Sequence, residues 1–202
     1  MQPFRLFASP WWVNLLPLVP LLAYGWWRRR GLELSPGQLL LAALFATAFG
    51  FVEGAVVVYL RAAVGLLPGY QGTLADVARL SSGLYQQTQS VRQLPPSLLA
   101  VELVREAATL LMLVSVALLA ARTFRERCAL FLWCFAIWDL AYYGSLWATV
   151  RWPASVRDTD VLFLIPVPWL SQVWFPVLVS LLALLAVLLA RRKGSRGSRH
   201  EY

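Results

Sequence analysis

Long apolar runs separated by short polar connections dominate the chain. A transmembrane α-helix needs about 20 mostly apolar residues, and five segments meet or approach this length. They cover residues 11–27, 39–60, 98–121, 129–150 and 173–190. The first segment is short, and its Pro17 and Pro20 are expected to kink it. The pattern therefore predicts an all-α fold, a polytopic transmembrane helix bundle of about five spans.

Two of the connections carry hydrophobic patterns of their own. Between Pro68 and Pro96, apolar residues recur every three or four positions, which is typical of an amphipathic helix on a membrane surface. These residues are Leu74, Val77, Leu80 and Leu84. Residues 161–169 are apolar but too short to span a membrane, and Pro166 and Pro168 exclude a regular helix there. We expect both segments on the outer side, with the proline-broken one packed against the bundle before the last span.

Composition and charge also favour a membrane protein. Hydrophobic residues make up 59% of the 202 residues and charged residues 14%, whereas ordinary soluble domains contain about 45–50% and about 25%. An ordinary soluble protein is therefore excluded. The net charge of +8 does not indicate a nucleic-acid partner, because the basic residues lie in short runs beside the apolar segments. Membrane lipids are the expected partners of such runs.

The distribution of basic residues predicts the orientation of the chain. Eleven of the 18 Lys and Arg residues fall on one side of the predicted bundle, within residues 28–30, 122–127 and 191–199, and six fall on the other. Cytoplasmic connections are the richer in Lys and Arg. We therefore expect a bacterial inner-membrane protein with its N-terminus outside. Residues 1–190 would form a single transmembrane helical domain, and residues 191–202 a basic, disordered cytoplasmic tail.

Five ionisable residues fall inside the predicted spans, and they are the most informative part of the sequence. They are Glu53, Glu102, Arg105, Glu106 and Asp139. Each costs roughly 2.5–3.5 kcal/mol at the centre of a transmembrane helix, so all five are expected to face the bundle interior. Counting about 1.5 Å per residue places them about 7–16 Å below the outer membrane boundary.

Helical spacing allows these polar side chains to meet. Residues 102–109 present one polar stripe on the third span, and residues 139–143 present one polar face on the fourth. Glu53 lies between Gly50 and Gly54, a spacing that allows another helix to approach closely. The sequence thus predicts an acidic pocket open to the outer side. Its expected ligand-binding residues are Glu53, Glu102, Arg105, Glu106, Asp139, Tyr142 and Tyr143, and its expected lid or rim residues are Asp158, Asp160 and Trp169.

A purely structural role for these charges is the main alternative. Arg105 can pair with Glu102 and Glu106 and simply fix the register of the helices. One arginine cannot, however, neutralise four carboxylates. The remaining carboxylates must be protonated or must meet water, a cation or the amine of a ligand.

The residues that are absent restrict the chemistry. The single histidine, His200, lies in the tail, which excludes bis-histidine haem ligation, a histidine-containing zinc site and Ser-His or Cys-His catalysis inside the membrane. No P-loop, dinucleotide fingerprint or CxxC pair occurs. Cys128 and Cys134 are interpreted as inert thiols. A metal would have only oxygen ligands, so no cofactor is expected apart from a divalent cation such as Mg²⁺, Ca²⁺ or Mn²⁺.

Three strings along the chain resemble an uncharacterised family of small multi-pass bacterial membrane proteins. They are FGFVEGAVVVYLR, ELVREAAT and WDLAYYGSLW, and they are followed by LFLIPVPW. The resemblance implies a multi-pass membrane protein but brings no activity, catalytic residue or substrate with it.

Three functions are compatible with this pattern. The first is binding, and with it transport, of a small polar or cationic ligand or a lipid head group in the acidic pocket. The second is a membrane enzyme that acts on a lipid-type substrate with a carboxylate-bound divalent cation. The third is a non-catalytic subunit of a larger membrane complex, for which the ten Trp residues and the Gly50–Gly54 spacing are suggestive. The sequence leaves open which of the three applies and whether the chain forms homo- or hetero-oligomers.

Overall fold

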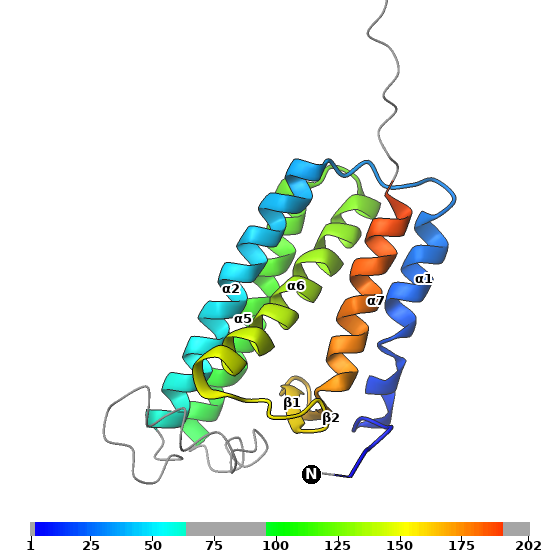
Figure 1. Cartoon of the computed structure of the whole chain (residues 1–202). Helices are drawn as coiled ribbons and strands as arrows, with labels where there is room; N and C mark the ends of the chain where they lie inside the picture. The colour runs from blue at the N-terminus through cyan, green and yellow to red at the C-terminus, as the bar shows by residue number, and fades with distance from the viewer. Residues whose placement is uncertain (1–2, 64–95, 192–202) are drawn as a thin grey trace, which may run out of the picture.

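The computed structural model of the protein describes residues 3–63 and 96–191. The described part is mostly helical, as the apolar runs predict, and successive α-helices run in opposite directions along one bundle (Figure 1). The predicted amphipathic helix around Leu74 to Leu84 and the predicted tail after Arg191 lie outside the described residues.

The elements follow the predicted apolar segments closely. In chain order they are a 3₁₀ helix η1 (Trp11–Leu15), α1 (Leu18–Trp27), α2 (Pro36–Ala63), α5 (Pro96–Ala120), α6 (Phe124–Val150), β1 (Thr159–Phe163), β2 (Trp169–Gln172) and α7 (Trp174–Ala190). The start of α6 is fixed by a capping box, in which Thr123 and Glu126 each accept a hydrogen bond from the backbone N–H of the other.

Within residues 3–63 and 96–191, three helices are long and apolar enough to cross a membrane by length and composition. They are Pro36–Tyr59 within α2, Pro96–Ala120 and Phe124–Val150. The 17 residues of α7 extend about 26 Å at 1.5 Å per residue. The first predicted span is not one helix, because η1 ends at Leu15 and a ten-residue α1 begins at Leu18. Pro17 separates the two, since proline has no backbone N–H to continue a helical ladder.

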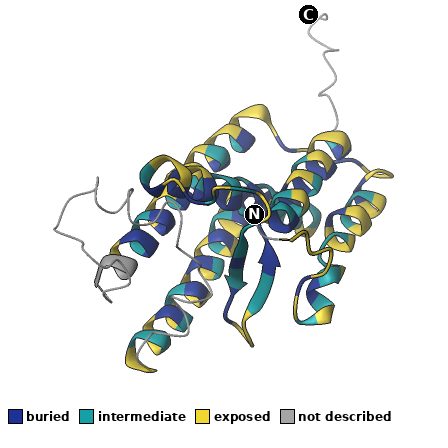
Figure 2. Cartoon of the chain, turned by 60° about the horizontal axis from the view of Figure 1, so that its bottom comes forward, coloured by how far each residue is buried: buried dark blue, intermediate teal, exposed yellow. Residues whose placement is uncertain are grey.

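The outward faces of the helices are apolar. Leu119 is 88% exposed, Leu22 72%, Val104 70% and Leu41 69%, and Figure 2 shows exposed residues along the outer sides of most helices. Soluble monomers rarely expose contiguous apolar surface on this scale. These faces are suited to contact with lipid.

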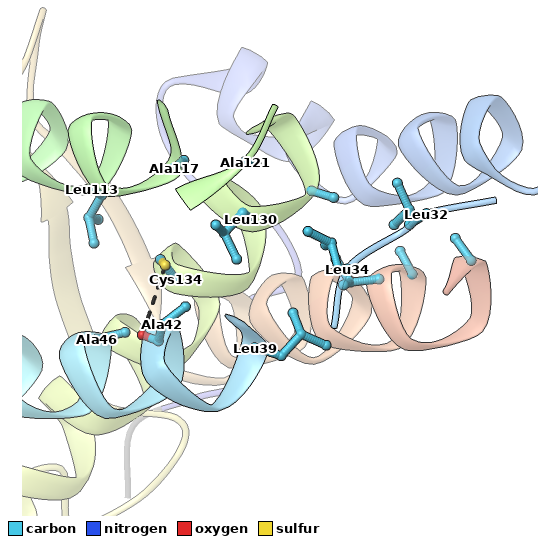
Figure 3. Packing of buried hydrophobic residues seen from close by; sticks show 14 of the residues in the cluster. Leu32, Leu34, Leu39, Ala42, Ala46, Leu113, Ala117, Ala121, Leu130 and Cys134 are labelled. Atoms are coloured by element: carbon cyan, nitrogen blue, oxygen red, sulfur yellow. Dashed lines mark hydrogen bonds between the residues drawn. The ribbon is translucent and has the colours of Figure 1, made fainter. Parts of the chain in front are cut away.

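The most continuous apolar core lies toward the end of the bundle that holds the α1–α2 and α5–α6 connections. Leu32 and Leu34 of the α1–α2 connection pack there with residues of α2, α5 and α6 (Figure 3). The buried Cys134 thiol approaches the Ala42 carbonyl oxygen at 3.9 Å. This packing agrees with the interpretation of Cys134 as a hydrophobic residue.

The opposite end of the bundle carries a β-hairpin in place of a helix. Strands β1 and β2 pair antiparallel from Thr159–Gln172 to Phe163–Trp169. The N-terminal segment joins them, because Ser9 and Leu170 exchange two backbone hydrogen bonds at 2.8 and 2.7 Å. The proline-broken segment is thus non-helical, as predicted, and it lies at the same end as the N-terminus (Figure 1).

The small-residue seam on α2 is used inside the chain. A Cβ atom added at Gly50 would lie 2.6 Å from the Trp138 carbonyl oxygen and 2.8 Å from the Ala141 Cβ atom, and one added at Gly54 would meet Ser145. The Gly50–Gly54 spacing therefore serves the contact between α2 and α6 and does not by itself indicate a protein partner.

We expect Gly50→Ala to lower the free energy of unfolding by about 1–3 kcal/mol, because the added methyl group meets rigid backbone. Gly25→Ala is the matched control, since nothing lies within 4 Å of a Cβ at Gly25 and alanine is the better helix former. Reversible unfolding in detergent measures both variants. Equal stability of the two would show that α2 and α6 do not pack at this distance.

Candidate functional site

A cavity of about 340 Å³ lies between the helices and the hairpin, and residues of α1, α2, α5, α6, α7 and both strands line it. All seven residues predicted to bind a ligand are among the lining residues: Glu53, Glu102, Arg105, Glu106, Asp139, Tyr142 and Tyr143. Asp160 and Trp169 line it as well, whereas Asp158 does not.

Arg105 connects α5 to α2. Its Nε atom donates to Glu102 Oε2 at 2.6 Å, one turn away on the same helix, and its guanidinium also forms an ion pair with Glu53 of α2. Thr109 donates a hydrogen bond to the other Glu53 oxygen at 3.2 Å. The sequence interpretation paired Arg105 with Glu102 and Glu106, but the second partner is Glu53, because the Gly50–Gly54 seam turns that carboxylate into the bundle.

Glu106 binds the hairpin through a backbone donor. Its two carboxylate oxygens lie 2.8 and 2.9 Å from the backbone nitrogen of Leu164, which donates to them. Leu164 directly follows β1, so this contact fastens the hairpin turn to α5. Sequence reasoning missed the contact because a backbone N–H leaves no signal in the pattern of side chains.

Asp160 is part of the wall of the cavity and not its rim. The residue is only 1% exposed, and Tyr143 donates its hydroxyl hydrogen to Asp160 Oδ2 at 2.6 Å. The Val161 backbone N–H donates to the other oxygen at 2.8 Å. Asp158 instead accepts hydrogen bonds from the backbone N–H groups of Ala154 and Ser155 at 2.8 and 3.1 Å. It stabilises the turn after α6.

Asp139 has a different environment from the other carboxylates. It is 8% exposed, and Ser180 of α7 donates a hydrogen bond to its Oδ2 atom at 2.8 Å. Over residues 3–63 and 96–191, no basic side chain forms an ion pair with it. Sequence reasoning overlooked Ser180, although it is the single polar residue in the apolar sequence of α7.

Negative charge is in excess around the cavity. Within the part of the chain that the structure describes, five carboxyl groups line it, those of Glu53, Glu102, Glu106, Asp139 and Asp160, and one guanidinium. Coulombic interactions are strong in such a poorly solvated place, so the excess must be balanced by protons or by a bound positive charge.

The carboxyl groups do not form a metal site among the described residues, because no three His, Cys, Asp or Glu side chains there are placed to hold one ion. Divalent cations such as Ca²⁺ need six or more oxygen ligands, and Mg²⁺ needs near-octahedral geometry.

Comparisons with protein-family models, with curated proteins and with solved structures find no match for this chain. Function is therefore inferred from the site itself.

We expect Arg105→Leu to destabilise the protein by about 3–5 kcal/mol, because it leaves Glu53 and Glu102 buried without their cation. Replacing Glu53 by Leu in the same chain should recover part of this loss. Arg157→Leu, at an exposed position, is the control and should change stability by less than about 0.5 kcal/mol. Equal unfolding free energies for Arg105→Leu and Arg157→Leu would contradict the role of the ion pair.

A second prediction concerns the hairpin. Glu106→Leu removes both acceptors of the Leu164 N–H, so local opening of the hairpin should become easier by about 1–3 kcal/mol. Hydrogen exchange of the Leu164 amide should then be roughly 5- to 150-fold faster. Glu106→Gln keeps one acceptor oxygen and should have a smaller effect, and Val104→Leu, on the exposed face of α5, should have none. Unchanged exchange in Glu106→Leu would show that this carboxylate does not hold the hairpin.

Proposed function

We propose that this chain is an integral protein of the bacterial inner membrane that binds a small cationic or polar ligand in its intramembrane cavity. The ligand would enter from the outer side, and binding would be the first step of its transport. The proposal has three parts, which concern the membrane, the orientation of the chain and the charge of the site.

Five crossings of the membrane are the arrangement that best suits the helices. Helices α2, α5 and α6 are long enough alone, and α7 approaches the hydrocarbon thickness of about 30 Å. The 3₁₀ helix η1 and α1 follow one another along α7 (Figure 1). Together they would form the first crossing, with the break at Pro17 packed against protein, where irregular backbone is tolerated.

The orientation rests on where the basic residues lie. One end of the bundle holds the end of α1, the α5–α6 connection and the end of α7 (Figure 1). The basic residues at these places are Arg28 to Arg30, Arg122, Arg125, Arg127 and Arg191. That end is assigned to the cytoplasm. The hairpin and the N-terminus lie at the other end, so the cavity beneath the hairpin would belong to the outer half of the membrane.

The excess of carboxyl groups over cations around the cavity is the observation that carries the proposal. A volume of about 340 Å³ falls in the range of small-molecule sites, about 300–1,000 Å³. Most of the lining side chains are apolar or aromatic, and a few buried polar groups converge on them. This combination is typical of a site that binds an organic ligand and selects it by charge.

The other two functions receive less support. For an enzyme that uses a carboxylate-bound divalent cation, residues 3–63 and 96–191 contain no preformed group of three or more ligand side chains, so the substrate would have to supply part of the coordination. A subunit that contacts its partner through Gly50 and Gly54 is disfavoured, because α6 already covers that seam.

The test is ligand-induced stabilisation of the full chain in lipid nanodiscs. We expect at least one member of a panel of organic amines, amino acids and alkylated ammonium salts to raise the melting temperature by several degrees, since a ligand at 100 times its Kd stabilises by about 2.7 kcal/mol. Glu53→Gln and Glu102→Gln should reduce the ligand-induced rise in melting temperature, because each removes a negative charge from the cavity. Glu33→Gln, at an exposed position outside the cavity, should leave that rise unchanged.

Two outcomes would contradict the proposal. If no organic compound shifts the melting temperature, the cavity is not a ligand site of this kind. If only Mg²⁺ or Mn²⁺ does so, and a chelator reverses the shift, the metal-dependent enzyme becomes the better explanation.

A further inference from the structure

Aromatic rings form a continuous group on one side of the cavity. Its members are Phe135, Trp138, Tyr142 and Tyr143 of α6, Phe163 of β1 and Trp169 of β2, and all six line the cavity. The centroids of neighbouring rings are 5.3 to 6.5 Å apart. The shortest distances are those of Tyr142–Tyr143 and Phe163–Trp169, and the longest is that of Trp138–Phe163. We call these six residues the aromatic group.

Asp139 belongs to the same stretch of α6 as four of these rings. Phe135 and Trp138 precede it by four residues and one residue, and Tyr142 and Tyr143 follow it by three and four. Side chains at three- and four-residue spacing share a helix face, so the carboxylate is accompanied by rings on its own helix. Phe163 packs on this set from the hairpin, since its ring lies 6.1 Å from Phe135 and 6.5 Å from Trp138.

The remaining carboxyl groups around the cavity already have strong partners. Arg105 pairs with Glu53 and Glu102, and the Leu164 N–H occupies Glu106. Asp160 accepts from the Tyr143 hydroxyl and a backbone N–H. Asp139 has the Ser180 hydroxyl and, within the described residues, no cation.

We propose that the ligand is an alkylated ammonium compound with an apolar body, and that its cationic head lies in the cavity beside Asp139 and against the aromatic group. This inference rests on the proposed function and names the class of ligand. The head would gain Coulombic attraction from the carboxylate and cation–π attraction from the rings. The apolar body would contact the aliphatic walls, which include Val57, Leu110 and Val179.

Alkylation is the feature that the surroundings select. A bare ammonium or metal ion is strongly hydrated and needs several oxygen ligands to replace its water. An alkylated ammonium carries few or no N–H donors, so aromatic faces satisfy it without further acceptors. The same chemistry occurs in free ammonium compounds and in the head groups of choline-type lipids.

The experiment compares choline with two close analogues on the full chain in phosphatidylglycerol nanodiscs. In 3,3-dimethylbutanol a carbon atom replaces the charged nitrogen, and ethanolamine keeps the charge without the methyl groups. Tryptophan fluorescence and melting temperature report binding. We expect choline to bind at least tenfold more tightly than either analogue.

Variants test the assigned residues. Asp139→Asn should weaken choline binding at least tenfold, and Phe163→Leu about fivefold, as loss of one aromatic face implies. Phe124→Leu, an exposed aromatic position far from the cavity, and Glu33→Gln should leave binding unchanged. Asp139→Asn removes a buried charge, so the melting temperature of this variant should not fall. If it does fall, Phe163→Leu provides an independent test of the site.

The outcomes separate this inference from the proposed function. Equal binding of 3,3-dimethylbutanol and choline, preferential binding of ethanolamine, or full binding to Asp139→Asn would overturn the inference, while the cavity would remain a ligand site. If no compound of the whole panel bound, both the inference and the proposed function would be overturned. Competition by dihexanoyl-phosphatidylcholine would support the inference with a lipid head group as the source, and binding of choline without such competition would support it with a free compound.

Discussion

Burying more carboxyl groups than cations inside an apolar bundle is the constraint on which the rest of this structure depends. In the proposed membrane setting, a carboxylate exposed to acyl chains is costly near the membrane centre, and α2, α5 and α6 do turn their acidic residues inward. Three helices that do so at one level cannot fill the space between them with hydrocarbon. The cavity therefore follows from the inward-facing acidic residues. The outer faces of the same helices are apolar.

The glycine seam and the hairpin allow the acidic groups to be accommodated. Gly50 and Gly54 bring α2 so close to α6 that Glu53 is carried into the bundle, within reach of Arg105 on α5. At the end of the bundle near the N-terminus, a hairpin supplies what the interior of a helix cannot, namely a free backbone N–H at Leu164 for Glu106. Buried backbone outside regular helices needs hydrogen-bond partners, and here the Glu106 carboxylate and the Leu164 N–H bond to each other.

Much of this arrangement is predictable from the sequence, since apolar runs locate the helices and the cost of buried charge locates the inward faces. The predicted bounds of α2, α5, α6 and α7 differ from the observed ones by at most a few residues, and Glu53, Glu106 and Asp139 do line one cavity. The details that pattern reasoning misses depend on tertiary geometry. The choice of Arg105 partners, the use of a backbone donor by Glu106 and the pairing of Asp139 with Ser180 cannot be read from spacing along one helix. The break between η1 and α1 shows that Pro17 ends a helix where only a kink is expected, whereas Pro20 lies within the first turn of α1.

The structural and the functional interpretations of the buried charges apply to different residues. On the α2–α5 side, Arg105 pairs with both Glu53 and Glu102 and joins two helices, so these residues have a structural role. On the α6–α7 side, Asp139 has only a hydroxyl partner among the described residues and shares its cavity with aromatic rings, which neutralise no charge but attract cations. Helix association therefore accounts for the first group and leaves the second unexplained. Because burying a carboxyl group without a cation has a free-energy cost that an apolar residue would avoid, Asp139 is the residue for which the proposed ligand offers the most direct explanation.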